Sequence, residues 1–312
     1  MSGLPARRLA LPTRAALRSA SPWVWVLLLL ATLEIAIGIR PDVLTFSAPY
    51  SFTDVLAAVL APTALVIAAA LMFVAPRERL IQLAAFGLAV PEAVKLVRLA
   101  LPLIEDAIGQ SSYWDLLPQR LYEWTNALSS VTWTLTLAAL LALALYIGRV
   151  RSQRGWLIVL GSAVLAVALA VVHISNWLSL VDQIGDGLIL AGSDKPSLLD
   201  LALGIASQLV IVGWGYLLAA AYEQRKRLLA VGTTAAVMTH IPYLLTASVL
   251  LDWWQQDQSG ANLTVLSLLG DVITLVYAVV FIGGVLTELP RHGPIPAADG
   301  RVSRAEAFSA GR

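Results

Sequence analysis

The distribution of Lys and Arg between apolar segments constrains this chain more than any other feature of its sequence. Eight apolar stretches can be drawn, at 22–39, 54–75, 80–104, 126–147, 156–181, 199–222, 228–250 and 262–285. Each is about long enough to cross a hydrocarbon core of ~30 Å at ~1.5 Å rise per residue. If all eight cross, 16 of the 21 Lys and Arg residues fall on one side and three on the other. Because basic loops resist translocation, the sequence predicts an all-α, polytopic membrane bundle of eight transmembrane helices with both termini in the cytoplasm.

The third stretch, 80–104, decides the number of spans because it carries Glu92, Lys95 and Arg98. The alternative is an amphipathic helix that lies flat in the membrane interface. Every later loop would then change sides, and the basic residues would divide into 10 inside and 11 outside. Only a crossing third stretch keeps the bias, so we expect it to span the membrane. Pro91 is expected to kink this helix beside Glu92.

The composition agrees with a membrane protein and excludes several kinds of chemistry. Hydrophobic residues make up 58% of the chain and charged residues 13%, which is too little polar surface for a soluble domain of this size. Cysteine is absent, which excludes disulfides, thiolate nucleophiles and Cys-ligated metals. The 18 Arg against three Lys are typical of a GC-rich bacterial genome, so we expect the bacterial inner membrane.

The chain divides into three parts by composition. Residues 1–21 are predicted to form a basic cytoplasmic tail, and residues 22–286 the transmembrane domain. Residues 287–312 are rich in Pro, Gly, Ala and Ser, which predicts a disordered cytoplasmic tail. The lipid bilayer is therefore the main environment of the protein, and nothing in the sequence indicates a nucleic-acid partner.

Several ionisable or polar residues fall inside the apolar stretches, where each charge costs about 2.5–3.5 kcal/mol unless it has a partner, water or a function. Most of them lie at the midplane or in the outer half of the membrane, which predicts a polar, hydrated cavity that opens outward. The candidate ligand-binding or ion-pair network consists of Glu34, Glu92, Lys95, Arg98, His240 and Asp271.

The charges of the third stretch predict specific partners. At ~100° per residue, Glu92, Lys95 and Arg98 lie on one helix face, and Glu92 precedes Lys95 by three residues, which favours an ion pair. Arg98 has no local partner, so Glu34 or Asp271 from another helix is expected to supply one. The other interpretation is structural: interhelical ion pairs fix the packing register, and Lys95 and Arg98 snorkel outward.

A second group of polar residues lies toward the outer surface. His173 and Asn176 occupy the outer end of the fifth stretch, and Asp182 and Asp186 follow. These four residues are assigned to the outer mouth of the cavity, although the two Asp residues by themselves favour a solvated acidic loop. His173 and His240 differ in depth by about 7 Å at ~1.5 Å per residue, which does not favour bis-His haem. Neither a cofactor nor a metal is predicted.

The outer side carries 12 acidic and three basic residues. This asymmetry either complements the positive-inside bias or concentrates cations at the cavity mouth. The chain has no dinucleotide, Walker, H-E-x-x-H or G-x-S-x-G motif, which favours a role other than catalysis. The leading hypothesis is a transporter-like or ligand-binding protein for a cationic or amphiphilic small molecule.

Two other functions stay open. The first is a non-catalytic subunit or anchor of a membrane complex, in which the same charges pair with each other or with a partner subunit. The second and weaker one is an enzyme that modifies lipids at the outer leaflet, with His173 or the pair Asp182 and Asp186 as its chemistry.

Overall fold

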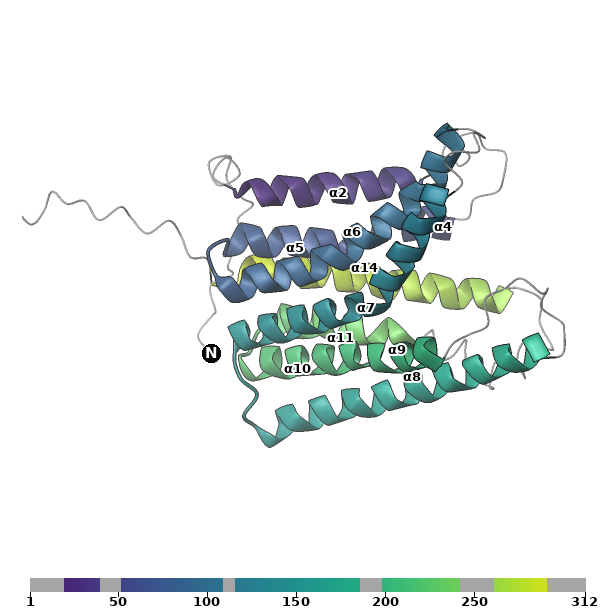
Figure 1. Cartoon of the computed structure of the whole chain (residues 1–312). Helices are drawn as coiled ribbons and strands as arrows, with labels where there is room; N and C mark the ends of the chain where they lie inside the picture. The colour runs from purple at the N-terminus through teal and green to yellow at the C-terminus, as the bar shows by residue number, and fades with distance from the viewer. Residues whose placement is uncertain (1–19, 40–51, 109–115, 186–197, 242–260, 291–312) are drawn as a thin grey trace, which may run out of the picture.

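The computed structural model describes residues 20–39, 52–108, 116–185, 198–241 and 261–290 (Figure 1). This part of the chain is all-helical and contains no strand, which confirms the predicted class. Its helices are α2 (Pro22–Gly38), α4 (Phe52–Leu60), α5 (Thr63–Val74), α6 (Arg79–Ile108), α7 (Leu116–Ile147), α8 (Gln153–Gly185), α9 (Leu198–Ser207), α10 (Leu209–Glu223), α11 (Arg227–Met238) and α14 (Ala261–Glu288). Most of the two predicted tails lies outside the described residues.

Five helical segments are long and apolar enough to cross a membrane: Val55–Val74, Arg79–Ala100, Gln153–Leu178, Leu201–Glu223 and Leu268–Glu288. Three further apolar helices in the described ranges are shorter: Pro22–Gly38, Val131–Ile147 and Arg227–Met238. The chain is therefore a multi-pass membrane protein. The charged third stretch is among the five long segments. The count of eight spans and their orientation stay predictions.

Helix packing closes six of the described helices into a ring. Around it, α5 packs on α6, α6 on α7, α7 on α10, α10 on α11, α11 on α14, and α14 on α5. Outside the ring, α2 packs against α4, α5 and α6, whereas α8 packs against α9 and α10. Figure 1 shows α2 and α8 at opposite edges of the bundle. The two outer helices therefore contact different parts of the ring.

The apolar core is concentrated at the end of the bundle where the connections are short. We call this the tight-loop end; it contains the links α5 to α6, α7 to α8 and α10 to α11. The last third of α14 buries Ala278, Phe281 and Val285, whereas residues 268–277 contain no fully buried side chain. The same holds for α9, in which no described side chain is fully buried. Packing is thus loosest away from the tight loops, where most of the polar candidates lie.

Two prolines in apolar stretches have different effects. Pro62 separates α4 from α5 within the stretch predicted as one helix, because proline lacks the N–H that would continue the helical ladder. The Thr63 hydroxyl donates to the Leu60 carbonyl at 2.6 Å across this break. Pro91, in contrast, leaves α6 helical on both sides. The helix is thus continuous through Pro91, and the kink expected there stays a prediction.

The stretch 199–222 is also two helices, α9 and α10, which meet at Gln208. The carbonyl of Gly204 is satisfied there by side chains: Ser207 Oγ donates to it at 2.7 Å and Gln208 Nε2 at 3.1 Å. Hydrocarbon offers no hydrogen-bond partners to a free carbonyl. A helix can therefore break inside an apolar segment only where side chains donate to the carbonyls that the break leaves free, as they do here.

Glycines set the spacing of α11 and α14. A Cβ built on Gly232 would lie 2.7 Å from the backbone N and Cα of Phe281, so only glycine allows this approach. A Cβ on Gly283 of α14 would meet nothing within 4 Å. The two positions therefore form a matched pair for substitution.

We predict that Gly232→Ala lowers the free energy of unfolding by roughly 1–3 kcal/mol, because the helices must separate. Gly283→Ala should be neutral or stabilising by up to about 1 kcal/mol, since alanine is the better helix former. Thermal unfolding of both variants in detergent measures the difference. Equal effects would contradict the packing of α11 on α14.

The orientation is tested by single-cysteine labelling, which is clean because the native chain contains no cysteine. We predict that Asp194→Cys reacts with an impermeant thiol reagent from outside. Arg151→Cys should react only after the cells are permeabilised. The reverse pattern at either position would overturn the eight-span topology.

Candidate functional site

The charged residues of α2 and α6 form a cluster of two carboxylates around one ammonium. Lys95 Nζ lies 2.8 Å from Glu34 Oε1 and 3.1 Å from Glu92 Oε2. We call Glu34, Glu92 and Lys95 the ion triad. The contact between Glu92 and Lys95 confirms the pair predicted from their three-residue spacing. The contact with Glu34 joins α2 to α6, which pack against each other.

Glu34 contacts Lys95, a pair that was not predicted from the sequence. The sequence predicts Glu34 or Asp271 as the partner of Arg98. Arg98 lies one helical turn farther from the tight-loop end than Lys95, about 4.5 Å at ~1.5 Å per residue, so Lys95 is closer to Glu34 in depth. Arg98 and Asp271 each have an interaction of their own, and a pair between them stays a prediction.

The triad is unequally buried and unequally charged. The Glu34 side chain is 0% exposed, Glu92 20% and Lys95 44%. Glu34 Oε2 is buried and has no hydrogen-bond partner in the described part of the chain. Because a buried polar atom without a partner is costly, the site favours an additional donor or positive charge. With two carboxylates and one ammonium, the triad carries a formal charge of −1.

Three aromatic rings of α10 and α14 pack against one another, and one of them, Tyr277, lies near Glu92. Trp214 of α10 meets Tyr277 and Phe281 of α14 edge to face, at centroid distances of 5.6 Å and 5.8 Å. Tyr277 and Phe281 are 5.7 Å apart and tilted. Tyr277 is within electrostatic range of Glu92. Ring faces attract cations, so Tyr277 is the member of this cluster closest to a role beside the triad.

The other predicted site residues do not all join the triad. His240 is half-buried just beyond the end of α11, and Asp271 lies on α14. His173 and Asn176 lie on α8, at the opposite edge of the bundle from α2 (Figure 1). The structure does not describe the side chain of Asp182 or any part of Asp186. The predicted outer mouth is thus separate from the triad where the structure describes it.

The structure shows a contact of His173 that the sequence did not indicate. Its imidazole occupies the space that a Cβ of Gly204 would fill, beside the break between α9 and α10. One turn along α8, Trp177 Nε1 is buried without a hydrogen-bond partner in the described chain. In the sequence only Gly204 hints at this contact, because a glycine in an apolar stretch indicates close packing. It does not indicate that His173 is the residue packed against it.

No group of three or more His, Cys, Asp or Glu side chains suited to hold a metal ion occurs among the described residues. The ion triad contains only two such side chains together with a competing ammonium. Its donor set therefore suits an organic cation or a proton better than a multivalent metal, which prefers several oxygen ligands.

A double-mutant cycle tests the triad. We predict that Lys95→Met destabilises the protein, because it leaves two facing carboxylates without their cation. Glu34→Gln in the same chain should recover part of the loss, with a coupling energy of roughly 0.5–3 kcal/mol. The free energy of unfolding in detergent is the measurement. In the control cycle, Glu78→Gln at the tight-loop end takes the place of Glu34→Gln and should show no coupling to Lys95→Met. Additive effects of Lys95→Met and Glu34→Gln would exclude the ion pair.

Comparison of the chain with known protein families, with characterised proteins and with solved structures finds no match.

Proposed function

We propose that this multi-pass membrane protein is a transporter-like or ligand-binding protein for a small organic cation in the bacterial inner membrane. The ion triad is its binding site, reached from the outer side. The single observation that carries this proposal is the excess of one carboxylate over the ammonium at a site within apolar helices.

The charge excess gives the site a chemical preference. In hydrocarbon an uncompensated carboxylate is unstable, so a second positive group gains more there than it would in water. A ligand with an ammonium group supplies both the charge and a donor for Glu34 Oε2. An amphiphilic cation would also place its apolar part against the aromatic cluster of Trp214, Tyr277 and Phe281.

The exposed fractions of the triad side chains indicate the order in which a ligand would reach them. Lys95 is partly exposed while Glu34 is fully buried, so a ligand reaches the ammonium and Glu92 before it reaches Glu34. An incoming cation competes with Lys95 for the shared carboxylates. Binding therefore favours conformations in which Lys95 has turned away, and this difference in affinity couples the ligand to a change of shape.

The acidic outer side supports the same choice of ligand. The 12 acidic residues assigned to it by the sequence would raise the local concentration of cations and speed their arrival. The packing of the described helices, which is dense at the tight-loop end and looser away from it, supports an opening on the same side.

One observation favours the alternative of a subunit in a membrane complex. Lys95 is 44% exposed on α6, and the apolar neighbours Val97 and Leu99 are exposed as well. A partner helix with an acidic residue would cover this surface and neutralise the ammonium. The lipid-modifying alternative depended on His173 and on Asp182 and Asp186, and gains no support from the described residues.

The proposal predicts that Glu92→Gln abolishes ligand binding and spares the fold. The change makes the triad neutral, because Lys95 keeps Glu34 as its partner, so the melting temperature without ligand should change little. A screen of organic ammonium compounds identifies the ligand by thermal stabilisation, which is worth about 2.7 kcal/mol at ~100-fold over the dissociation constant. Glu92→Gln should weaken the apparent affinity of the best compound about tenfold or more.

Glu78→Gln is the matched control, because it removes one carboxylate just before the start of α6, at the tight-loop end and outside the triad. It should leave the affinity unchanged. Equal affinity in wild type and Glu92→Gln would assign the triad a structural role. Co-purification with a fixed membrane partner, together with no stabilising compound, would favour the complex-subunit alternative.

A further inference from the structure

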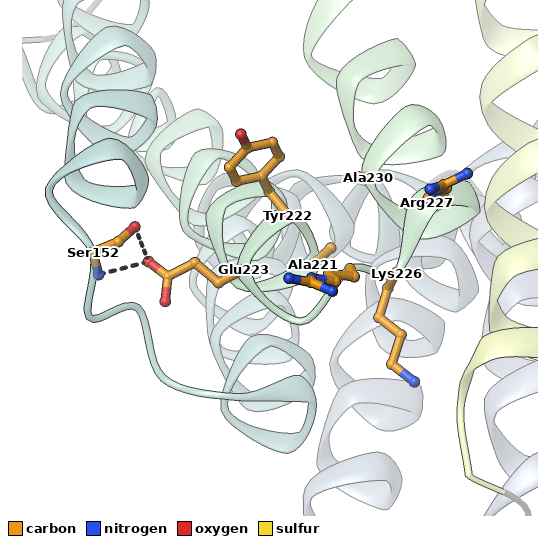
Figure 2. A pocket seen from close by; sticks show the side chains of 8 residues that line it. Ser152, Ala221, Tyr222, Glu223, Lys226, Arg227 and Ala230 are labelled. Carbon is orange, nitrogen blue, oxygen red and sulfur yellow. Dashed lines mark hydrogen bonds between the residues drawn. The ribbon is translucent and has the colours of Figure 1, made fainter. Parts of the chain in front are cut away.

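A pocket at the tight-loop end has the composition of an anion site. It has a cavity volume of about 650 Å³ and lies between α8, α10 and α11 (Figure 2). Its polar lining residues are Ser152, Tyr222, Glu223, Arg225, Lys226 and Arg227. We propose that this pocket binds the phosphate of an anionic phospholipid headgroup.

The one carboxylate that lines the pocket is already engaged. Glu223 accepts from the backbone N–H of Arg151 at 3.0 Å and of Ser152 at 2.8 Å, and from Ser152 Oγ at 2.7 Å. Figure 2 shows its carboxylate directed toward Ser152 and away from Lys226 and Arg227. It therefore caps the N-terminus of α8 and does not pair with the basic lining residues.

A second carboxylate at this end is engaged in the same way. Glu288, at the end of α14, accepts from the backbone N–H of Leu228 and of Leu229, both at 3.0 Å, and so caps α11. Lys226 Nζ donates to the Glu288 carbonyl at 2.5 Å. Neither Arg225 nor Arg227 has an ion-pair partner in the part of the chain that is described. Both guanidinium groups are thus available to an anion.

The backbone at Arg225 gives an independent reason to assign a role to its side chain. Arg225 has φ 54°, the left-handed region, which no other non-glycine residue adopts in the described chain. It follows the end of α10, and the next residue, Lys226, donates its N–H to the Ala221 carbonyl at 2.9 Å. This is the hydrogen bond of a Schellman cap, whose left-handed position usually holds glycine. Arginine there adds strain and supplies a charge that glycine lacks.

The position of the pocket favours a lipid as the source of the phosphate. It lies where α10 ends and α8 begins, at the limit of two apolar segments. Trp156 of α8 packs edge to face on Tyr216 of α10, with centroids 6.3 Å apart, at the same end. Trp and Tyr favour the headgroup level of a membrane, and basic clusters at that level attract anionic lipids. Arginine is well suited to phosphate because its planar fork forms two hydrogen bonds.

The test uses Arg225→Gly, which removes the charge and suits the backbone. The full chain is placed in nanodiscs of phosphatidylcholine alone or with one quarter phosphatidylglycerol, and melting is followed. Wild type should melt higher with phosphatidylglycerol. Arg225→Gly should lose most of this rise, with an apparent affinity for the anionic lipid that is lower by about tenfold. Its melting in phosphatidylcholine should be unchanged or higher.

Two matched variants and one free ligand complete the experiment. Arg225→Lys should keep part of the lipid-dependent rise, and Arg79→Gln, a basic residue at the same end outside the pocket, should keep all of it. Inorganic phosphate added to the protein in detergent distinguishes the sources. A rise with phosphate that equals the lipid effect, and that Arg225→Gly removes, would overturn the lipid assignment and leave a free anion as ligand. An equal lipid effect in wild type and Arg225→Gly, or none in wild type, would overturn the pocket itself.

Discussion

The rest of the site depends on the two ion pairs that the ammonium group of Lys95 forms with Glu34 and Glu92. The ammonium lies between two carboxylates, one on its own helix and one on α2, so it offsets one of their two negative charges and attaches α2 to α6. Apolar packing alone would not fix this position, because lipid tails are as apolar as the facing side chains. The contact still leaves Glu34 Oε2 without a hydrogen bond among the described residues. The contact that attaches α2 to α6 therefore lies beside a buried carboxylate oxygen that still lacks a donor in the described chain.

The helices were predictable because a segment in hydrocarbon must satisfy its backbone internally, and apolar length alone reveals it. The pair Glu92 and Lys95 was predictable from their spacing on one helix. The contact of Glu34 with Lys95 was not, because depths counted from span ends are uncertain by about a turn. The breaks at Pro62 and Gln208 were not predicted, because each lies inside a segment that is long and apolar enough to be read as one helix. The ring order was also out of reach, because faces rich in Leu and Ala fit many neighbours equally well.

Glu223 and Glu288 cap helix N-termini at the tight-loop end, where most of the neighbouring charged residues are basic. Each ends one helix and accepts the free N–H groups that begin an antiparallel neighbour. Loops can then be short and basic without leaving helix N-termini unsatisfied. Acidic residues contribute little to topology, so these two acids are compatible with the orientation expected from Lys and Arg.

The closed ring limits how the molecule can change shape. Among the described helices each member of the ring packs on both neighbours, so two halves that rock against each other would have to part at two of these contacts. The densely packed end would have to come apart for that motion. Bending at the interruptions near Pro62 and Gln208 leaves it intact, because both lie away from the tight loops. These two joints, one at the start of α5 and one at the start of α10, are therefore the places where the described helices can bend while the tight-loop end stays packed.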